Sequence, residues 1–222
     1  MFTVRAHGGL CNRLRVVLSY RAWRGSITCV WLPDEQIAGA RWADVFEPLP
    51  GVSFLYEDPG VVDVMACDPT HAAPQHWPLT YRDVRLREEH EARRLGVRAA
   101  LGGPYSAVHA RRTDCTEMAQ AAGAYTTDEE LAAWAAQALA PIYIATDNGT
   151  TQRALAQALA GMGKRPAWLE DIPEASTLRH TTLAASAIDL FVCAGSAEFK
   201  GSGASSFTNA VHTMRKIGGW WQ

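Results

Sequence analysis

The chain has 222 residues, enough for one large domain or two compact ones, and 48% of them are apolar while 20% are charged. This composition is typical of a globular protein. The formal net charge of −2 lacks the basic excess that nucleic acids and anionic membranes attract, so neither partner is expected. No apolar stretch approaches the roughly 20 residues that cross a bilayer, so no integral membrane segment is expected.

The cysteines argue against two kinds of stabilising site. There are five of them, an odd number, and none are spaced as C-x-x-C: Cys11, Cys29, Cys67, Cys115 and Cys193. This pattern disfavours a disulfide framework and a structural zinc site, so no metal is expected. Cysteines that do not form disulfides are typical of proteins in a reducing compartment. Because the N-terminus also lacks an apolar signal core, a cytoplasmic location is expected.

The first half of the chain predicts alternating strands and helices. The expected elements are a strand at 2–6, a helix at 14–23, a strand at 27–31, a loop with a short helix at 34–46, strands at 52–56 and around 61–65, and a charged helix at 87–101. Gly102-Gly103-Pro104 ends that last helix. We place a domain boundary there, which gives domains 1–103 and 104–222.

The second half repeats the alternation. Strands are expected at 105–110, 142–146, 167–169 and 198–201, and helices at 127–139, 150–162, 176–193 and 207–215. Thr126 or Thr127 is the expected N-cap of the first of these helices. Strands that alternate with helices in both halves predict an α/β fold with parallel sheets.

A glycine pair, Gly8-Gly9, stands between the first expected strand and its helix. This order is typical of an anion-binding loop, since the unpaired N–H groups at a helix start face the ligand. The residues match neither a Walker A loop nor a G-x-G-x-x-G fingerprint. A simple tight turn is the alternative interpretation.

The segment VHARRTDCTE, residues 108–117, carries the strongest chemical signal. His109 and Arg111 are two apart in an expected strand and therefore share a face, whereas Arg112 points the opposite way. An arginine fork suits a phosphate or diphosphate, and charges at a buried strand end need an anion or carboxylate. The alternative for Arg112 is a structural ion pair with Asp114.

Two later positions also allow more than one interpretation. The turn from Ser202 to Ser206 places small hydroxyl residues before a helix, where they could wrap a phosphate. Ordinary N-capping by Ser205 or Ser206 would explain it equally. Asp189 lies on an otherwise apolar helix face, where a buried carboxylate needs partners such as the N–H groups of a guanine. A solvent-facing position is the alternative.

Taken in order, these segments resemble the fucosyltransferase superfamily that uses GDP-fucose, which includes α1,6-fucosyltransferases, rhizobial Nod-factor fucosyltransferases and protein O-fucosyltransferases. GGLCNRL at 8–14 looks like the G-G-L-x-N-[QR]-L opening of these enzymes. Residues 31–48 are similar to the stretch that follows it. His109 to Asp114 matches the H-x-R-R-T-D motif. Residues 187–190 and 201–207 resemble the region that closes over the nucleotide.

The resemblance implies a GT-B-like fold, two Rossmann-like parallel-sheet domains that face a cleft, and an inverting, metal-independent transfer. The donor substrate would be GDP-fucose, with no cofactor, and the acceptor a glycan hydroxyl. Arg111 would hold the β-phosphate and stabilise the leaving diphosphate, because without a metal its charge must be met by fixed donors. The residues that would bind the GDP-sugar are Gly9, Asn12, Arg13, His109, Arg111, Asp147, Asp189, Ser202, Ser205 and Ser206.

The chain also departs from this pattern. Cys11 stands where glycine is common, Lys200 and Gly203 alter the usual nucleotide loop, and Cys115 replaces a lysine of the α1,6 enzymes. Asp114 and Glu117 are the candidates for general base, and an oxocarbenium-like path could dispense with one. The acceptor and the oligomeric state cannot be inferred. Two alternatives stay open: a transferase for another GDP-sugar, and a catalytically silent nucleotide-binding module. A phosphatase or kinase fits poorly, since the sequence shows neither a metal-ligand cluster nor a P-loop.

Overall fold

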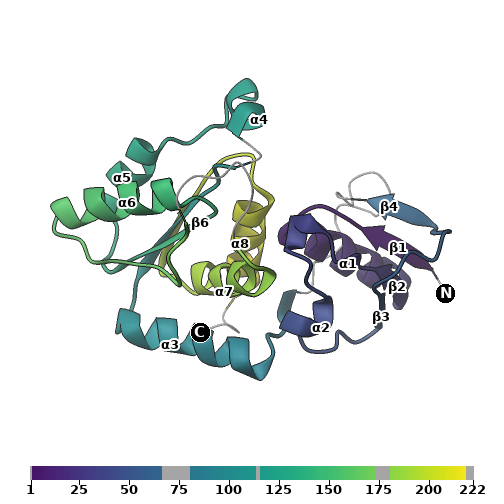
Figure 1. Ribbon diagram of the computed structural model, residues 1–222. Coiled ribbons are helices and arrows are strands. Elements are labelled where there is room, and N and C mark those ends of the chain that lie inside the picture. The colour runs from purple at the N-terminus through teal and green to yellow at the C-terminus, as the bar shows by residue number, and fades with distance from the viewer. Residues whose placement is uncertain (1, 67–80, 114–115, 174–180, 219–222) are drawn as a thin grey trace. The chain divides into compact units, whose positions relative to one another are not determined.

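The computed structural model describes residues 2–66, 81–113, 116–173 and 181–218 (Figure 1). The chain divides into two compact units, Met1–His90 with Thr182–Ala187, and Glu91–Thr181 with Ile188–Gln222. Within the described residues, each unit contains one four-stranded sheet. The contacts divide the chain at His90, upstream of the boundary placed at residue 103, and the two functional domains 1–103 and 104–222 stay a prediction.

The sheet of the first unit is entirely parallel, with the order β3-β2-β1-β4. Its strands are β1 (Thr3–Ala6), β2 (Ile27–Val30), β3 (Val52–Leu55) and β4 (Val64–Ala66). Helix α1 (Leu10–Arg24) packs on β1 and β2. It begins earlier than residue 14 because Gly8, at φ +84°, turns the chain and Gly9 is the N-cap, so the helix starts directly after the glycine pair.

The segment expected as a loop with a short helix holds two short helical pieces around an aromatic cluster. These are η1 (Glu35–Ile37) and α2 (Trp42–Val45). The Trp42 ring stacks on Phe54 of β3 with 4.5 Å between ring centroids, and Trp31 meets Trp42 edge-on at 5.5 Å. Stacked and edge-on rings bury large apolar areas, so this cluster fixes the segment against the sheet. A further short piece is η3 (Tyr81–Asp83).

The second unit has a parallel sheet with the order β7-β6-β5-β8. Its strands are β5 (Ser106–Ala110), β6 (Ile142–Thr146), β7 (Pro166–Ala167) and β8 (Glu198–Gly201). The helices that follow α2 are α3 (Glu88–Leu101), α4 (Thr116–Ala121), α5 (Asp128–Gln137), α6 (Gly149–Gly161), α7 (Leu183–Ala194) and α8 (Ser206–Ile217). The sequence did not predict α4. The N-terminal part of the helix expected at 176–193 lies partly outside the described residues.

Alternate residues of the central strands face different helices. Val108 and Ala110 of β5 and Ile144 of β6 belong to one apolar cluster with side chains of α5 and α6. Those two helices therefore cover one face of the sheet (Figure 1). Tyr105, just before β5, donates from its hydroxyl to the carbonyl oxygen of Val192 in α7 at 2.7 Å, on the opposite face. The expected α/β class with two Rossmann-like parallel-sheet domains is confirmed.

Local capping chemistry explains where α5 starts. The Thr127 hydroxyl accepts from the backbone N–H of Glu130, and the Glu130 carboxylate accepts from the N–H of Thr127. This reciprocal pair is a capping box, which satisfies two of the otherwise unpaired donors of a helix start. Of the two threonines proposed as N-cap, Thr127 is the one used.

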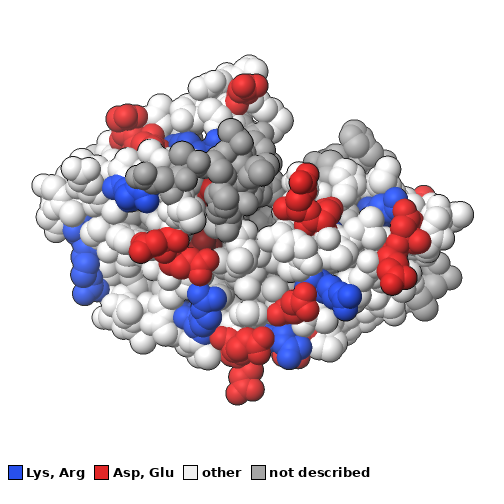
Figure 2. Space-filling model, in the orientation of Figure 1, with Lys and Arg blue, Asp and Glu red and all other residues white. Residues whose placement is uncertain are grey.

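The surface carries both signs of charge. Acidic and basic side chains are interspersed on the face drawn in Figure 2. Among the residues that the structure describes, none of the helices is both long and apolar enough to reach across a bilayer.

The start of α6 provides a test of packing in the second unit. A Cβ added at Gly149 would lie 2.2 Å from the carbonyl oxygen of Ile172 and 2.5 Å from that of Pro173. We expect Gly149→Ala to lower the free energy of unfolding by about 1–3 kcal/mol, because backbone must move. Gly161→Ala is the matched control, since its Cβ would meet no atom within 4 Å. Urea unfolding would measure both, and equal midpoints for the two variants would contradict the packing argument.

Candidate active site

Asp147 organises the carboxyl ends of β5 and β6. It follows β6 directly, and its side chain is only 6% exposed. One carboxylate oxygen accepts from the backbone N–H of Arg112 at 2.9 Å, and the other accepts from the Thr113 hydroxyl at 2.7 Å. The Arg111 Nε lies 3.1 Å from the same carboxylate. Asp147 therefore sets both the path of the chain beyond β5 and the direction of the Arg111 side chain.

Arg112 points to the α5 side of the sheet, as strand alternation predicts. Its Nε and Nη2 donate to the Asp128 carboxylate at 3.0 and 2.5 Å, and Nη2 also donates to the carbonyl oxygen of Thr126 at 2.9 Å. Its guanidinium lies 5.0 Å from the ring centroid of Tyr125. The structural ion pair of Arg112 is thus made with Asp128, whereas the alternative drawn from the sequence named Asp114, which lies outside the described residues.

The Ser202–Ser206 turn is fastened to the end of β5. The Ser202 hydroxyl accepts from the backbone N–H of Arg111 at 3.0 Å and lies within hydrogen-bond distance of the His109 carbonyl oxygen. Ser205 caps α8, since its hydroxyl accepts from the N–H of Thr208 at 3.4 Å. Ser206 is the first residue of α8. Ser202 and Ser205 therefore already have structural tasks, and any contact of theirs with phosphate stays a prediction.

Gly203 allows this turn to lie against a neighbouring loop. Its backbone N–H donates to the Thr126 hydroxyl at 3.2 Å. A Cβ at position 203 would lie 2.1 Å from the carbonyl oxygen of Ala124, so only glycine permits this approach. Although the sequence showed only that Gly203 departs from the family pattern, the structure gives the reason for the residue.

His109 is buried on the face of the sheet opposite Arg112. Its ring stacks on Phe207 with centroids 4.2 Å apart, and its Nδ1 lies 3.1 Å from the Thr208 hydroxyl. Burial lowers the pKa of His109 to about 3, against the opposing charge of Asp147. The imidazole is therefore neutral at physiological pH, and the positive charge available to an anion at this strand end belongs to Arg111.

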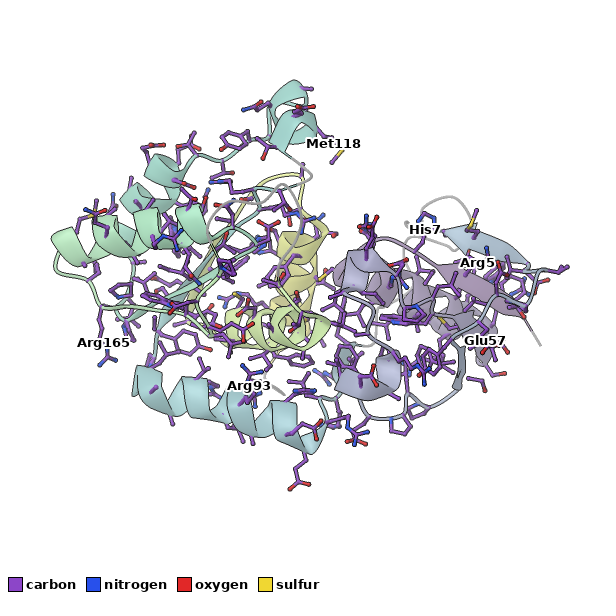
Figure 3. All side chains as sticks on the ribbon, viewed as in Figure 1. Arg5, His7, Glu57, Arg93, Met118 and Arg165 are labelled. Atoms are coloured by element: carbon purple, nitrogen blue, oxygen red, sulfur yellow. The ribbon has the colours of Figure 1, made fainter. Side chains whose placement is uncertain are left out.

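Asp189 is buried in α7, which excludes the solvent-facing alternative. The Tyr143 hydroxyl of β6 donates to its carboxyl group at 2.5 Å. Burial raises the pKa of Asp189 to about 7, although the hydrogen bond from Tyr143 lowers it. Glu170 adds to the rise, and Arg93 opposes it. Arg93 extends from α3 and lies 3.1 Å from Glu170 (Figure 3). A contact between Asp189 and a nucleotide base stays a prediction.

In the first unit, the candidate residues make hydrogen bonds to nearby residues of the same unit. The Arg13 side chain has no exposed surface and donates to the carbonyl oxygens of Gly8 and Leu32 and to the Asp34 carboxylate, at 2.7, 2.8 and 2.5 Å. Burial lowers the pKa of Arg13, and Asp34 counteracts this. Arg13 thus connects segment 8–14 to segment 31–48, the two N-terminal segments in which the sequence resembles the fucosyltransferase superfamily. Asn12 accepts from Arg15 at 3.3 Å, and Gly9 is buried as the N-cap of α1.

Of the two candidate bases, the structure describes only Glu117. Glu117 is exposed on α4. Asp114 lies outside the described residues, so its place in the site stays a prediction. Within the described ranges, no group of three or more His, Cys, Asp or Glu side chains is arranged to hold a metal ion.

Several residues that build this site were not among the site residues predicted from the sequence. Asp128, Thr126, Thr208 and Tyr143 each contact a candidate residue from a distant segment. Thr208 could have been anticipated as the N3 partner of a Ser205 cap, because capping pairs have that spacing. The other contacts arise only from the tertiary fold.

The role of Arg112 can be tested by removing its fork while keeping its charge. We expect Arg112→Lys to lower the free energy of unfolding by about 1–3 kcal/mol, because an ammonium group cannot reproduce the paired contacts to Asp128 and Thr126. The control is Arg153→Lys on the exposed side of α6. Urea unfolding would compare the two variants. A wild-type midpoint for Arg112→Lys would contradict a stabilising role for the contacts of Arg112 with Asp128 and Thr126.

Asp189 predicts a pH dependence of stability. Its pKa of about 7 in the folded protein exceeds the unfolded value of about 4, so the folded state binds more protons between these values. The wild type should therefore lose stability as pH rises from 5 to 8, while Asp189→Asn lacks this titration. We expect the stability difference between Asn variant and wild type to shift in the variant's favour by on the order of 2 kcal/mol over that range. Parallel pH profiles in urea unfolding would disprove it.

Comparison with known proteins identifies the fold. No protein-family model matches the sequence, and no curated protein matches it. Among solved structures, NodZ α1,6-fucosyltransferase soaked with GDP-fucose is similar over 96% of this chain and 92% of its own, with 15% identity and a TM-score of 0.60. The fucosyltransferase NodZ from Bradyrhizobium is similar over 95% of this chain and 91% of its own, with 15% identity and a TM-score of 0.60. POFUT1 in complex with GDP-fucose is similar over 99% of this chain and 95% of its own, with 11% identity and a TM-score of 0.63. The chain therefore shares the GT-B-like fold of these NodZ and POFUT1 structures.

Proposed function

We propose that this protein is an inverting, metal-independent glycosyltransferase that moves fucose from GDP-fucose to a glycan hydroxyl. The observation that carries the proposal is the placement of Arg111, whose backbone is held by Ser202 and whose side chain is directed by Asp147. The motif resemblance and the shared fold support the choice of donor.

Arg111 lies at the carboxyl end of a central parallel strand, the edge at which α/β sheets bind their ligands. The turn bonded to its backbone leads into α8, and the amide groups at the start of a helix favour an anion. A guanidinium and a helix start together could hold a diphosphate. The neutral His109 would add shape and a hydrogen bond rather than charge.

The chemistry would proceed by displacement at the anomeric carbon of fucose. The bond from that carbon to the β-phosphate oxygen breaks while a bond to the acceptor oxygen forms, and the acceptor proton leaves to a base or to solvent. Arg111 would stabilise the negative charge that develops on GDP, the task that a fixed cation performs without reorganisation. Asp114 and Glu117 remain the candidate bases.

The first test is nucleotide selectivity. Calorimetry with GDP, UDP and ADP should show a clear preference for GDP. Donor-hydrolysis assays with GDP-fucose and other GDP-sugars would then identify the sugar. Equal affinities for the three nucleotides would remove the proposal, and GDP binding without turnover on any donor would favour a silent nucleotide-binding module instead.

The second test is the role of Arg111. We expect Arg111→Ala to lower turnover by about 10²–10³-fold, as the loss of one group that stabilises transition-state charge does. Arg111→Lys should recover only part of the loss, because a lysine lacks the paired donors. Arg153→Ala, on the exposed side of α6, is the control and should match the wild type. Unchanged turnover in Arg111→Ala would refute the assignment.

A further inference from the structure

The second unit contains a cavity of about 450 Å³, broadly open to solvent, on the α5 side of its sheet. The lining comes from the loop before α5, from α5 itself and from the edge strand β8, and consists of Gly123, Ala124, Tyr125, Thr126, Glu130, Ala133, Trp134 and Lys200. Its volume falls within the range of roughly 300–1,000 Å³ that small-molecule sites occupy. None of the residues named above for the donor lines it.

The lining combines aromatic rings with a few polar groups. Tyr125 and Trp134 are half-buried, and Trp134 packs on the apolar cluster of the sheet, which keeps its ring in place. Tyrosine and tryptophan offer an apolar face together with a polar edge. Such rings suit the C–H faces of a pyranose, while Lys200 and Glu130 can hydrogen-bond its hydroxyl groups.

The charge of the lining favours a neutral ligand. One lysine and one glutamate contribute its charged side chains. The nearby Arg112 guanidinium is already matched by Asp128, and it lies over the Tyr125 ring. A phosphate or nucleotide would therefore find less compensating charge here than beside Arg111. A neutral polar molecule that stacks on aromatic rings fits better.

We propose that this cavity is a carbohydrate subsite that binds a saccharide segment distinct from the donor sugar. Its description as part of the acceptor site rests on the proposed function, whereas saccharide binding itself does not. The cavity and the donor site share a wall, because Thr126 and Tyr125 contact Arg112, and Thr126 also holds Gly203. A saccharide here would be a part of the acceptor that is remote from the reacting hydroxyl.

The test begins with the intact protein on an array of defined oligosaccharides, followed by calorimetry with the strongest binder. Ala133 is an exposed alanine of α5, so Ala133→Gln fills the cavity with little effect on folding. Ala136→Gln, on the same helix but outside the lining, is the matched control. Trp134→Ala is a second variant, checked for folding by urea unfolding.

We expect Ala133→Gln and Trp134→Ala to weaken saccharide binding at least tenfold, while Ala136→Gln and the wild type bind equally and all four bind GDP alike. An array without a bound saccharide, or equal saccharide affinity in Ala133→Gln and wild type, would overturn the subsite. Saccharide binding that Ala133→Gln abolishes in a protein that does not prefer GDP would support the subsite and refute the proposed function.

Discussion

The carboxylate of Asp147 is the group on which the candidate active site depends. A buried carboxylate is costly unless donors or cations surround it. This one accepts hydrogen bonds from the Arg112 amide and the Thr113 hydroxyl and forms an ion pair with the Arg111 guanidinium. Through these contacts, Asp147 links the ends of the adjacent parallel strands β5 and β6. The direction of the chain beyond β5, from Arg111 to Thr113, is set by that link.

The two adjacent arginines illustrate how one strand serves both structure and chemistry. Since alternate side chains leave a strand on opposite faces, Arg112 is directed to the α5 loop, where Asp128 and Thr126 hold it. That contact anchors the backbone at the point where Arg111 leaves it. The neutral His109, packed between Phe207 and Thr208, fixes α8 from the other face. The strand end is thus held on both faces of the sheet while its first arginine remains partly accessible to a ligand.

The sequence predicted most of the strands and helices and the orientation of the central motif, but few of the contacts that the motif makes. Strand positions were predictable because continuous apolar runs bounded by glycine and proline are typical of buried parallel strands, and Thr127 was predictable as an N-cap from its chemistry. Helix α4 has too little apolar periodicity to reveal itself. The partner of Arg112 and the burial of Asp189 depend on segments that only the tertiary fold brings together.

The position of β8 at the edge of its sheet bears on how the protein folds. Ser106 of β5 pairs with Ile142 of β6 at a much shorter sequence separation than with Glu198 of β8, which lies 92 residues away. Closing the longer loop costs more chain entropy, so we expect β8 to join the sheet after the inner strands have met. Like β7 at the opposite edge, it has one neighbouring strand, so it is among the first to detach when the sheet opens locally. Ligand-binding competence would therefore be acquired late in folding and lost early in denaturation.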